Sequence, residues 1–323
     1  MGWWSDVLAD AARRSDKIEI VACFTRSANK RQAFAEKYEC RPAESYEEIL
    51  GDPRVEGIIN TTPNDVHLET TRAAAEAGKH IFLDKPIANS VSDGREIARI
   101  CKDAGVLIAV GYQRRREIQF RWIRKEIDEG RFGKLVQAEA NISRDREGRF
   151  DPSSWRFQAS GMPGGVMLQI GIHYVDVLEF LMGRVVAVSA RSAQLVLGGD
   201  NPDVANMLME HENGAQSILS ASYASASEYY LMNIYGKEAT AYYDIFGGLR
   251  RLTRGSEKPE QIPFEKNDTI REELEEFADC IRNGGEPEVD AERATDSLAV
   301  IRAGIRSTEE GRRVTVEEIL QPE

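Results

Sequence analysis

Short apolar runs alternate with amphipathic segments along the first part of the chain. Short apolar runs are typical of buried strands, and apolar residues at helical spacing are typical of helices that pack on a sheet. The predicted strands are 18–24, 55–60, 80–84 and 106–112, and the predicted helices are 3–14, 27–38, 46–50, 65–78 and 92–104. Strands that alternate with helices form βαβ units with parallel strands. We therefore expect residues 1–113 to form a doubly wound, Rossmann-type parallel sheet covered by helices.

The pattern changes after residue 114, where strand-like segments with alternating apolar and polar residues follow one another. The predicted strands are 135–143, 185–196, 206–211, 215–223, 230–235 and 239–245, and the predicted helices are 117–129, 270–283 and 292–310. Asn213-Gly214, between two of these strands, is typical of a two-residue hairpin turn. Successive strands without intervening helices form mostly antiparallel sheets. We therefore expect residues 114–323 to form a second, α+β domain with an open, mostly antiparallel sheet.

The predicted strand 80–84 ends abruptly at Lys85-Pro86. A lysine that precedes proline is disfavoured in a helix, so the strand stops there. In open α/β sheets, ligands bind beyond the carboxyl ends of the strands, which makes Lys85 a candidate functional residue. By itself, the same sequence is more often just a turn at the end of a strand.

Composition excludes several classes of function. The chain has 323 residues, with 42 Lys and Arg against 54 Asp and Glu, and its net charge is −12. Such an acidic chain is a poor binder of nucleic acids and anionic membranes. No apolar run is long enough to span a membrane, and the N-terminus does not resemble a signal peptide, so we expect a cytoplasmic protein. The four cysteines form no CxxC motif, which predicts reduced structural thiols and no metal site.

Three motifs occur in order along the chain: Thr62-Pro63-Asn64 with His67, then Asp84-Lys85-Pro86, then Gly164-Gly165 followed by Gly171-Ile-His173. In this order and spacing the chain resembles the Gfo/Idh/MocA oxidoreductases over essentially its whole length. The resemblance implies a dinucleotide-binding domain and a substrate domain whose open sheet builds homodimers or homotetramers. It also implies hydride transfer between a nicotinamide and an alcohol or carbonyl carbon, and we expect a small polyol, sugar-derived or cyclic diol substrate.

The resemblance implies that Lys85 and His173 are catalytic. Histidine titrates near neutrality and suits general acid/base work, whereas Lys85 would stabilise negative charge on the substrate oxygen. Gln169 stands where the family commonly has Asp, and we expect it to orient the substrate. If residues 166–182 form an α-helix, Gln169, His173 and Asp176 share one stripe. From the residues alone, His173 could instead be a satisfied core histidine, and Asp176 is expected to anchor backbone or an arginine.

Other residues of the two domains are expected to contact ligands. The predicted cofactor contacts are Thr62, Pro63, Asn64, His67, Asp84 and Pro86 together with Lys85, and the predicted substrate contacts are Tyr112, Arg114 and Trp155 with Gln169. Helix capping or packing is an equal alternative for His67. Arg114 can bind a carboxylate bidentately, but in a run of three arginines it can equally form solvated or interdomain ion pairs. Trp155 lies in a segment that resembles the one bordering the substrate in the family.

The N-terminus resembles the second half of a Gly-x-Gly-x-x-Gly fingerprint, with Gly2 as the second glycine and Ser5 in the third position. Gly2 and Trp3 are therefore expected at the cofactor. The first strand of the fold is absent from this sequence. Either the start of the chain is misassigned, or the sheet has a gap and we expect weak dinucleotide binding.

The strand 18–24 is followed by Arg26 and Ser27, with no carboxylate before Glu36. An acidic residue there would bind the ribose 2′-hydroxyl of NAD, whereas arginine suits the 2′-phosphate of NADP. We therefore expect NADP to be preferred over NAD. The alternative function is a non-catalytic ligand-sensing or regulatory protein on the same fold. Gln169 and the short N-terminus favour that alternative, and Lys85 with His173 favours the enzyme.

Overall fold

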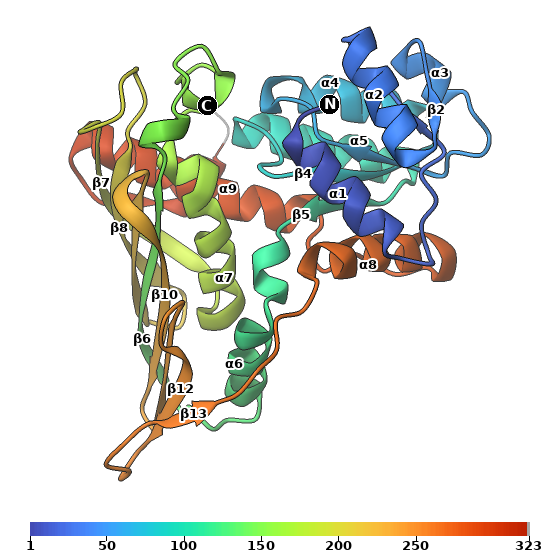
Figure 1. Ribbon diagram of the computed structural model, residues 1–323. Helices are drawn as coiled ribbons and strands as arrows, with labels where there is room; N and C mark the ends of the chain where they lie inside the picture. The colour runs from blue at the N-terminus through green and yellow to red at the C-terminus, as the bar shows by residue number, and fades with distance from the viewer. Residues whose placement is uncertain (322–323) are drawn as a thin grey trace. The chain divides into compact units, whose positions relative to one another are not determined.

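The computed structural model describes residues 1–321, and their contacts divide the chain into two compact units (Figure 1). The first unit comprises Met1–Ala88, Ser92–Gln113 and Asp268–Ala294, and the second comprises Asn89–Val91, Arg114–Asn267 and the described residues from Thr295 onward. The sequence analysis assigned residues 268–294 to the second domain, whereas their contacts in the structure group them with the first unit. Each unit is described by itself.

The first unit contains two short parallel sheets. Its strands are β1 (Ala22–Cys23), β2 (Arg41–Pro42), β3 (Gly57–Asn60), β4 (His80–Asp84) and β5 (Ile108–Gly111). β1 pairs with β2, and the other three pair in the order β3-β4-β5, all parallel. The expected Rossmann-type parallel architecture is therefore confirmed. The expected strand 18–24 is shorter in the structure, because β1 finds a ladder partner only in the two residues of β2.

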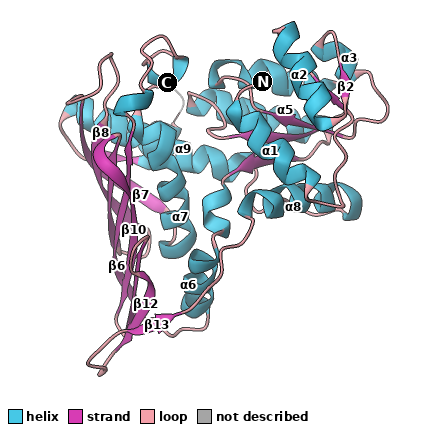
Figure 2. Ribbon diagram, in the orientation of Figure 1, coloured by secondary structure: helices cyan, strands magenta, loops and turns pink. Residues whose placement is uncertain are grey.

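Helices surround these strands (Figure 2). They are α1 (Trp3–Arg13), α2 (Ala28–Tyr38), α3 (Tyr46–Leu50), the 3₁₀ turn η1 (Asn64–Val66), α4 (His67–Glu76), α5 (Val91–Ala104) and α8 (Thr269–Asn283). Helix α1 supplies two cores: Leu8 packs with Phe82 of β4 and Phe277 of α8, while Ala9 packs with Phe34 of α2. Full burial of a side chain such as Leu8 stabilises the fold by about 1.5–3 kcal/mol. Helix α1 thus ties β4, α2 and α8 together.

The second unit is built on a large sheet, which in residues 1–321 has nine strands in the order β13-β12-β11-β10-β6-β9-β8-β7-β14. Their bounds are β6 (Leu135–Asp145), β7 (Val185–Ala193), β8 (Val204–His211), β9 (Gln216–Ser222), β10 (Ala224–Gly236), β11 (Ala239–Asp244), β12 (Gly248–Thr253), β13 (Glu260–Ile262) and β14 (Val314–Thr315). β6 and β9 are parallel, and the other pairs are antiparallel. The mostly antiparallel sheet is therefore confirmed, as is the hairpin at Asn213-Gly214, where Gly214 has φ 84°.

Helical segments complete the second unit: η2 (Gln113–Arg116), α6 (Ile118–Asp128), η3 (Glu147–Arg149), η4 (Trp155–Phe157), η5 (Met167–Gly171), α7 (Ile172–Met182), α9 (Ala291–Glu310) and α10 (Val316–Leu320). η2 and α9 cross the boundary between the units. Segment η5 is a π-helix, so the expectation of a continuous α-helix over 166–182 is wrong in its first turn. The wider π turn changes the angle between Gln169 and the residues of α7, and only His173 and Asp176 lie on regular α-helix.

Alternation along the strands gives the large sheet two different faces. Ala140 and Ile142 of β6 are almost fully buried on the inner face, against α7. On the outer face, Leu208 of β8 and Ile218 of β9 are 41% and 40% exposed. Within residues 1–321, no helix is both long and apolar enough to cross a membrane.

Candidate active site

Lys85 follows the last residue of β4, the middle strand of the β3-β4-β5 sheet. Ile81, Phe82 and Leu83 are at most 1% exposed, and burial falls where the chain reaches Asp84 and Lys85. The Asp84 carboxylate accepts a hydrogen bond of 3.0 Å from the backbone N–H of Lys85. The Lys85–Pro86 peptide bond is cis. The strand therefore places Lys85 at its carboxyl end, where ligands bind in this class of sheet.

The N-terminus of α1 is fixed to the same end of the sheet. The indole N–H of Trp4 donates to the carboxylate of Asp84 at 3.0 Å, and the hydroxyl of Ser5 lies 2.9 Å from that of Thr61, just after β3. Ser5 is 8% exposed, so its small side chain permits close packing of helix and strand. Trp4 and Ser5 were not predicted as contacts of these strands, because each pairs with a residue more than fifty positions away.

The N-terminus of helix α1 has the backbone geometry of an anion-binding site. Its N-cap Gly2 is extended, with φ −106° and ψ 173°, and makes no side-chain cap. The first amides of a helix have no intrahelical acceptor, so they bind anions together with the helix dipole. Trp3 is 64% exposed and lies edge-on to Trp4 at 5.3 Å between ring centroids. Gly2, Trp3 and Trp4 would therefore hold the phosphates through backbone N–H groups.

The turn after β3 is fixed by internal hydrogen bonds. The side-chain oxygen of Asn60 accepts from the backbone N–H of Thr62 at 3.1 Å and from its hydroxyl at 2.8 Å. Pro63 begins the 3₁₀ turn that contains Asn64, which is 4% exposed. This turn, predicted to contact the cofactor, lies at the carboxyl end of β3, beside β4.

His67 joins this turn to the one after Lys85. It is fully buried, with Nδ1 at 3.1 Å from the carbonyl of Pro86 and Nε2 at 3.0 Å from the carbonyl of Thr62. Burial lowers the pKa of His67, and the neighbouring carbonyl oxygens oppose that effect. The ring of His67 is therefore packed between the two loops that carry the predicted cofactor residues, and it sets their spacing.

The end of β1 leads into Arg26 and Ser27, both exposed. Ser27 is the N-cap of α2, but its hydroxyl makes no cap hydrogen bond. In the described part of the chain, Arg26 forms no ion pair. Both side chains are therefore available to a group bound at the end of β1.

In the second unit, His173 lies in the first turn of α7 and is 6% exposed. One turn further on, Asp176 accepts two hydrogen bonds from the guanidinium of Arg115, one of them 2.9 Å from Nε. The side chains of Arg115 and Asp176 are 5% and 1% exposed. The prediction that Asp176 anchors an arginine is confirmed, and this ion pair fixes α7.

Gln169 lies on η5, and both the nitrogen and the oxygen of its side-chain amide are hydrogen-bonded. Its Nε2 donates to the carbonyl of Arg156 at 3.1 Å, and its Oε1 accepts a hydrogen bond from the hydroxyl of Tyr223. Burial raises the pKa of Tyr223, so this phenol stays protonated and acts as the donor. Tyr223 was not predicted, although its place at the buried end of the alternating strand 215–223 could have identified it.

The remaining predicted substrate residues are packed side chains. Tyr112 is 1% exposed. The guanidinium of Arg114 pairs with Glu117 at 2.9 Å and lies 4.7 Å from the ring centroid of Tyr230, so its charge is already compensated within the second unit. Trp155 lies on η4 with the guanidinium of Arg156 4.5 Å from its ring centroid.

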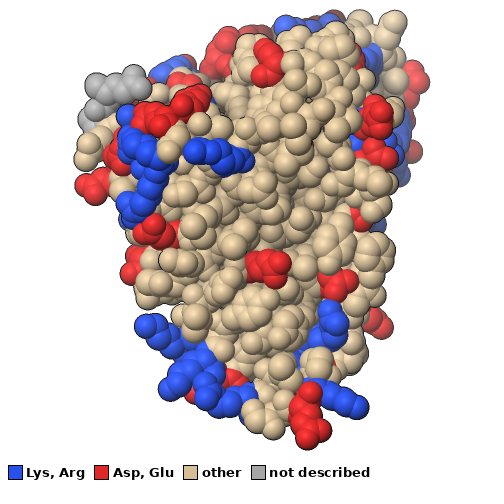
Figure 3. All heavy atoms as spheres, turned by 90° about the vertical axis from the view of Figure 1, so that its left-hand side faces the viewer, with Lys and Arg blue, Asp and Glu red and all other residues tan. Residues whose placement is uncertain are grey.

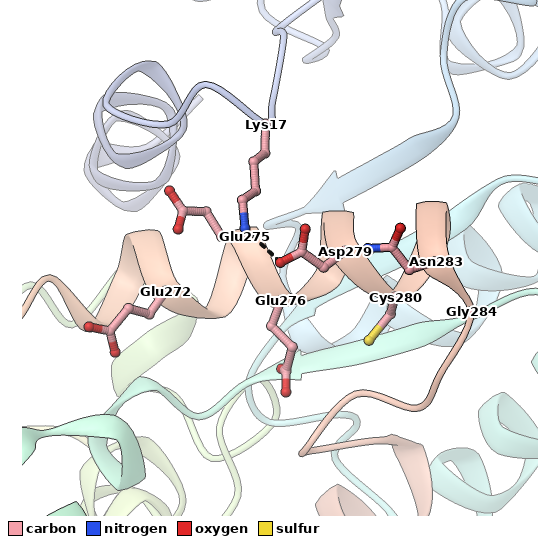
Figure 4. A pocket seen from close by; sticks show the side chains of 8 residues that line it. All are labelled: Lys17, Glu272, Glu275, Glu276, Asp279, Cys280, Asn283 and Gly284. Atoms are coloured by element: carbon pink, nitrogen blue, oxygen red, sulfur yellow. Dashed lines mark hydrogen bonds and ion pairs between the residues drawn. The ribbon is translucent and has the colours of Figure 1, made fainter.

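A hollow of about 390 Å³ lies along α8 in the first unit (Figure 4). Its lining residues are Lys17, Glu272, Glu275, Glu276, Asp279, Cys280, Asn283 and Gly284. Lys17 pairs with Asp279 at 2.7 Å, and none of the predicted site residues lines this hollow. We assign it no role.

The N-terminus of α1 lies at the carboxyl ends of β3 and β4, and Lys85 follows β4 directly. A helix N-terminus and a lysine at neighbouring strand ends are features of dinucleotide-dependent oxidoreductases. Residues 1–112 match the family model described as the oxidoreductase family, NAD-binding Rossmann fold, and residues 120–242 match the GFO/IDH/MocA C-terminal domain. The chain belongs to the Gfo/Idh/MocA oxidoreductase family. It is an NAD(P)-dependent oxidoreductase, which confirms the enzyme prediction over the non-catalytic alternative.

Several relatives match most of the chain. A solved structure from Desulfitobacterium hafniense, described as an NADPH-dependent oxidoreductase, is 32% identical, covers 99% of this chain and 96% of its own, and has a TM-score of 0.94. A 1,5-anhydro-D-fructose reductase from Ensifer adhaerens is 27% identical over 93% of this chain and 91% of its own length. An NADP-dependent scyllo-inositol 2-dehydrogenase from Bacillus subtilis is 26% identical over 84% of this chain and 82% of its own.

Proposed function

We propose that this enzyme transfers a hydride to or from a hydroxyl-bearing carbon of a small polyol, sugar-derived or cyclic diol substrate. The observation that carries the proposal is Lys85 at the carboxyl end of β4, with its backbone N–H bound by Asp84. The relatives whose names specify substrates act on sugar-derived or inositol compounds, which supports this substrate class.

Lys85 is proposed to bind the reacting oxygen of the substrate as a cation. Stabilisation of negative charge that develops on that oxygen is worth about 3 kcal/mol for a well-placed donor. When bound, the nicotinamide supplies or accepts the hydride. Asp84 holds the lysine backbone and receives the Trp4 indole, so it positions Lys85 rather than reacting itself.

His173 is proposed as the general acid/base for the hydroxyl proton. An alcohol that loses a hydride must also lose this proton, and the ordinary pKa of histidine suits the transfer near neutral pH. Gln169 cannot take a proton. Because its amide is held by Tyr223 and by the Arg156 carbonyl, we propose that it orients its neighbours.

These roles are tested by following nicotinamide absorbance with a panel of polyols, aldoses, inositols and dihydrodiols. Lys85→Ala and His173→Ala are each expected to lower kcat/KM by about a hundredfold or more. The matched control is Lys102→Ala, an exposed lysine on α5, which should leave turnover unchanged. Near-wild-type turnover by both active-site variants on a verified substrate would contradict the assignment.

NADP is proposed as the preferred cofactor. Arg26 and Ser27 follow β1 with their side-chain donors available, and a guanidinium pairs well with a 2′-phosphate. The relative from Desulfitobacterium hafniense is described as NADPH-dependent, which supports the same choice. Arg26→Ala should weaken NADP binding by calorimetry and leave NAD binding nearly unchanged. Tighter binding of NAD than of NADP by the wild type would reject the preference.

The outer face of the large sheet is proposed to join copies of the chain as a homodimer or homotetramer. Figure 3 shows this side of the molecule as a broad surface with few charged side chains, most of them toward its edges. Leu208, Ile218 and Val186 are exposed there by 41%, 40% and 37%. Exposed apolar patches of this kind mark protein interfaces. Leu208→Glu with Ile218→Glu should convert the oligomer to monomer in light scattering, and a monomeric wild type would rule the interface out.

A further inference from the structure

At one end of the large sheet, β6 carries an arginine onto the buried inner face. Ala140 and Ile142 are 2% and 0% exposed on that face, and alternation places Arg144 on the same side. On the adjacent β9, Ala221 is 3% exposed, and the same alternation continues to Tyr223 at 4%. Arg144 therefore lies on the same inner face as the tyrosine that donates to Gln169.

Arg146 brings a second cation to Tyr223. Its backbone N–H donates to the carbonyl of Tyr223 at 3.0 Å, and its guanidinium lies 6.0 Å from the tyrosine ring centroid. Arg144 lies 5.6 Å from the ring centroid of Tyr230, and its Nε is buried without a hydrogen-bond acceptor. Among residues 1–321, neither Arg144 nor Arg146 has a carboxylate within ion-pair distance. Arg114, which also lies against the Tyr230 ring, differs because it pairs with Glu117.

The carboxylates of Asp203 and Asp200 accept hydrogen bonds from backbone N–H groups. Asp203, whose carbonyl accepts from the Tyr223 N–H at 2.8 Å, receives three backbone N–H groups on its own carboxylate, from residues 195–197. Asp200 accepts the N–H of Ala159 at 2.9 Å. The charges of Arg144, Arg146 and Arg156 all act on Tyr223 and oppose the rise that burial causes in its pKa. Three guanidinium groups therefore bring positive charge to Tyr223 on the inner face of the sheet.

A half-buried guanidinium without a counter-ion is costly, and an oxyanion offers the acceptors that it lacks. We propose that Arg144 and Arg146, with Arg156 beside them, form a subsite for an oxyanion carried by the substrate. The preferred substrate is then an acidic polyol, either a sugar acid with a carboxylate or a sugar phosphate. This inference rests on the proposed function, because it takes the anion to be part of the substrate of that reaction.

The test uses the full chain with D-glucose, D-glucuronate and D-glucose 6-phosphate, and with myo-inositol beside an inositol monophosphate. Turnover is followed by nicotinamide absorbance, and binding is measured separately by calorimetry in the presence of NADP. The anionic member of a pair should be favoured about tenfold or more, and a rise in salt should reduce the preference. The glucuronate and phosphate arms distinguish a carboxylate from a phosphate subsite.

Arg144→Gln and Arg146→Gln should each reduce the affinity and kcat/KM for the anionic ligand at least about tenfold more than for its neutral partner. Arg144→Lys should restore part of this difference. The control is Arg149→Gln, which removes the same charge from an exposed position on η3 and should retain the preference.

The outcomes separate the two proposals. Turnover of neutral polyols with no preference for anions, unchanged in Arg144→Gln, overturns the subsite and leaves the proposed function standing. Anion binding that depends on Arg144, with no turnover of any compound, supports the subsite while the proposed function fails. Absence of binding of every anion in the panel overturns the subsite.

Discussion

The ion pair between Arg115 and Asp176 is predicted to be a main support of the second unit. Replacing Asp176 by Asn preserves the shape of the side chain but removes the charge. The Arg115 guanidinium, 5% exposed and 5.3 Å from the ring centroid of Phe180, then loses the negative charge of Asp176. Loss of one partner of such a buried pair costs about 3–5 kcal/mol.

This cost should be visible as a large fall in melting temperature. For a unit of this size, each kcal/mol corresponds to about 2–4 °C, so Asp176→Asn should lower Tm by about 6–20 °C. Differential scanning calorimetry measures the fall and shows whether both units unfold together. Amide hydrogen exchange should localise the loss of protection to α7.

Two further variants make the test specific. Arg115→Met with Asp176→Leu removes both charges, and such apolar replacements are often close to neutral, so most of the lost stability should return. Asp103→Asn breaks an exposed ion pair, with side chains 58% and 61% accessible, and should cost less than about 1 kcal/mol. If Asp176→Asn melts within about 2 °C of the wild type, the reasoning about this pair is refuted.

Three other changes are predicted. Burial raises the pKa of Glu179 to about 7, so the stability that its protonated form provides is present below pH 4.5 and is lost as pH rises to about 7. Glu179→Gln should match wild type at pH 4.5 and exceed it at pH 8 by up to about 3 kcal/mol in calorimetry. Gln169→Asp should raise the pKa of His173, the proposed acid/base, and shift the acid limb of the oxidative pH–rate profile to higher pH. An unchanged acid limb would show that residue 169 does not act electrostatically on His173. Gly165→Ala should lower the free energy of unfolding by about 1–3 kcal/mol in denaturant titration, because φ of Gly165 is +50° and an added Cβ meets the carbonyl of Pro202. Unchanged stability would show that the loop relaxes to accept the methyl group.

Much of the fold follows from local pattern. The helix at Tyr46–Leu50 was predicted at its observed position, and β4 ends within one residue of Lys85, where the lysine-proline pair was expected to stop it. Both signals act within a few residues of the chain. The alternating segments likewise predicted the large sheet. Short-range patterns therefore locate Lys85 and the second unit's strands well.

Contacts between residues far apart in the sequence account for the features that the hydrophobic pattern did not predict. Nothing near Trp4 indicates that its indole will bind Asp84, eighty positions away. The π turn that contains Gln169 is likewise not encoded by any helical period in the sequence. Arg144 could have been found, because it continues the alternation of β6 by one step beyond the predicted strand end.

The first unit is assembled from segments that are far apart in the sequence, and this affects how the protein folds during its synthesis. Leu274 and Phe277 of α8 pack in one core with Leu8 and Phe82, yet they are translated only after the whole of Arg114–Asn267. At a translation rate of about 5–20 residues per second, the N-terminal half waits on the order of ten seconds for the helix that completes it. During that interval its apolar surface is open to chaperones, and a nascent chain released before residue 268 cannot close its own nucleotide-binding unit.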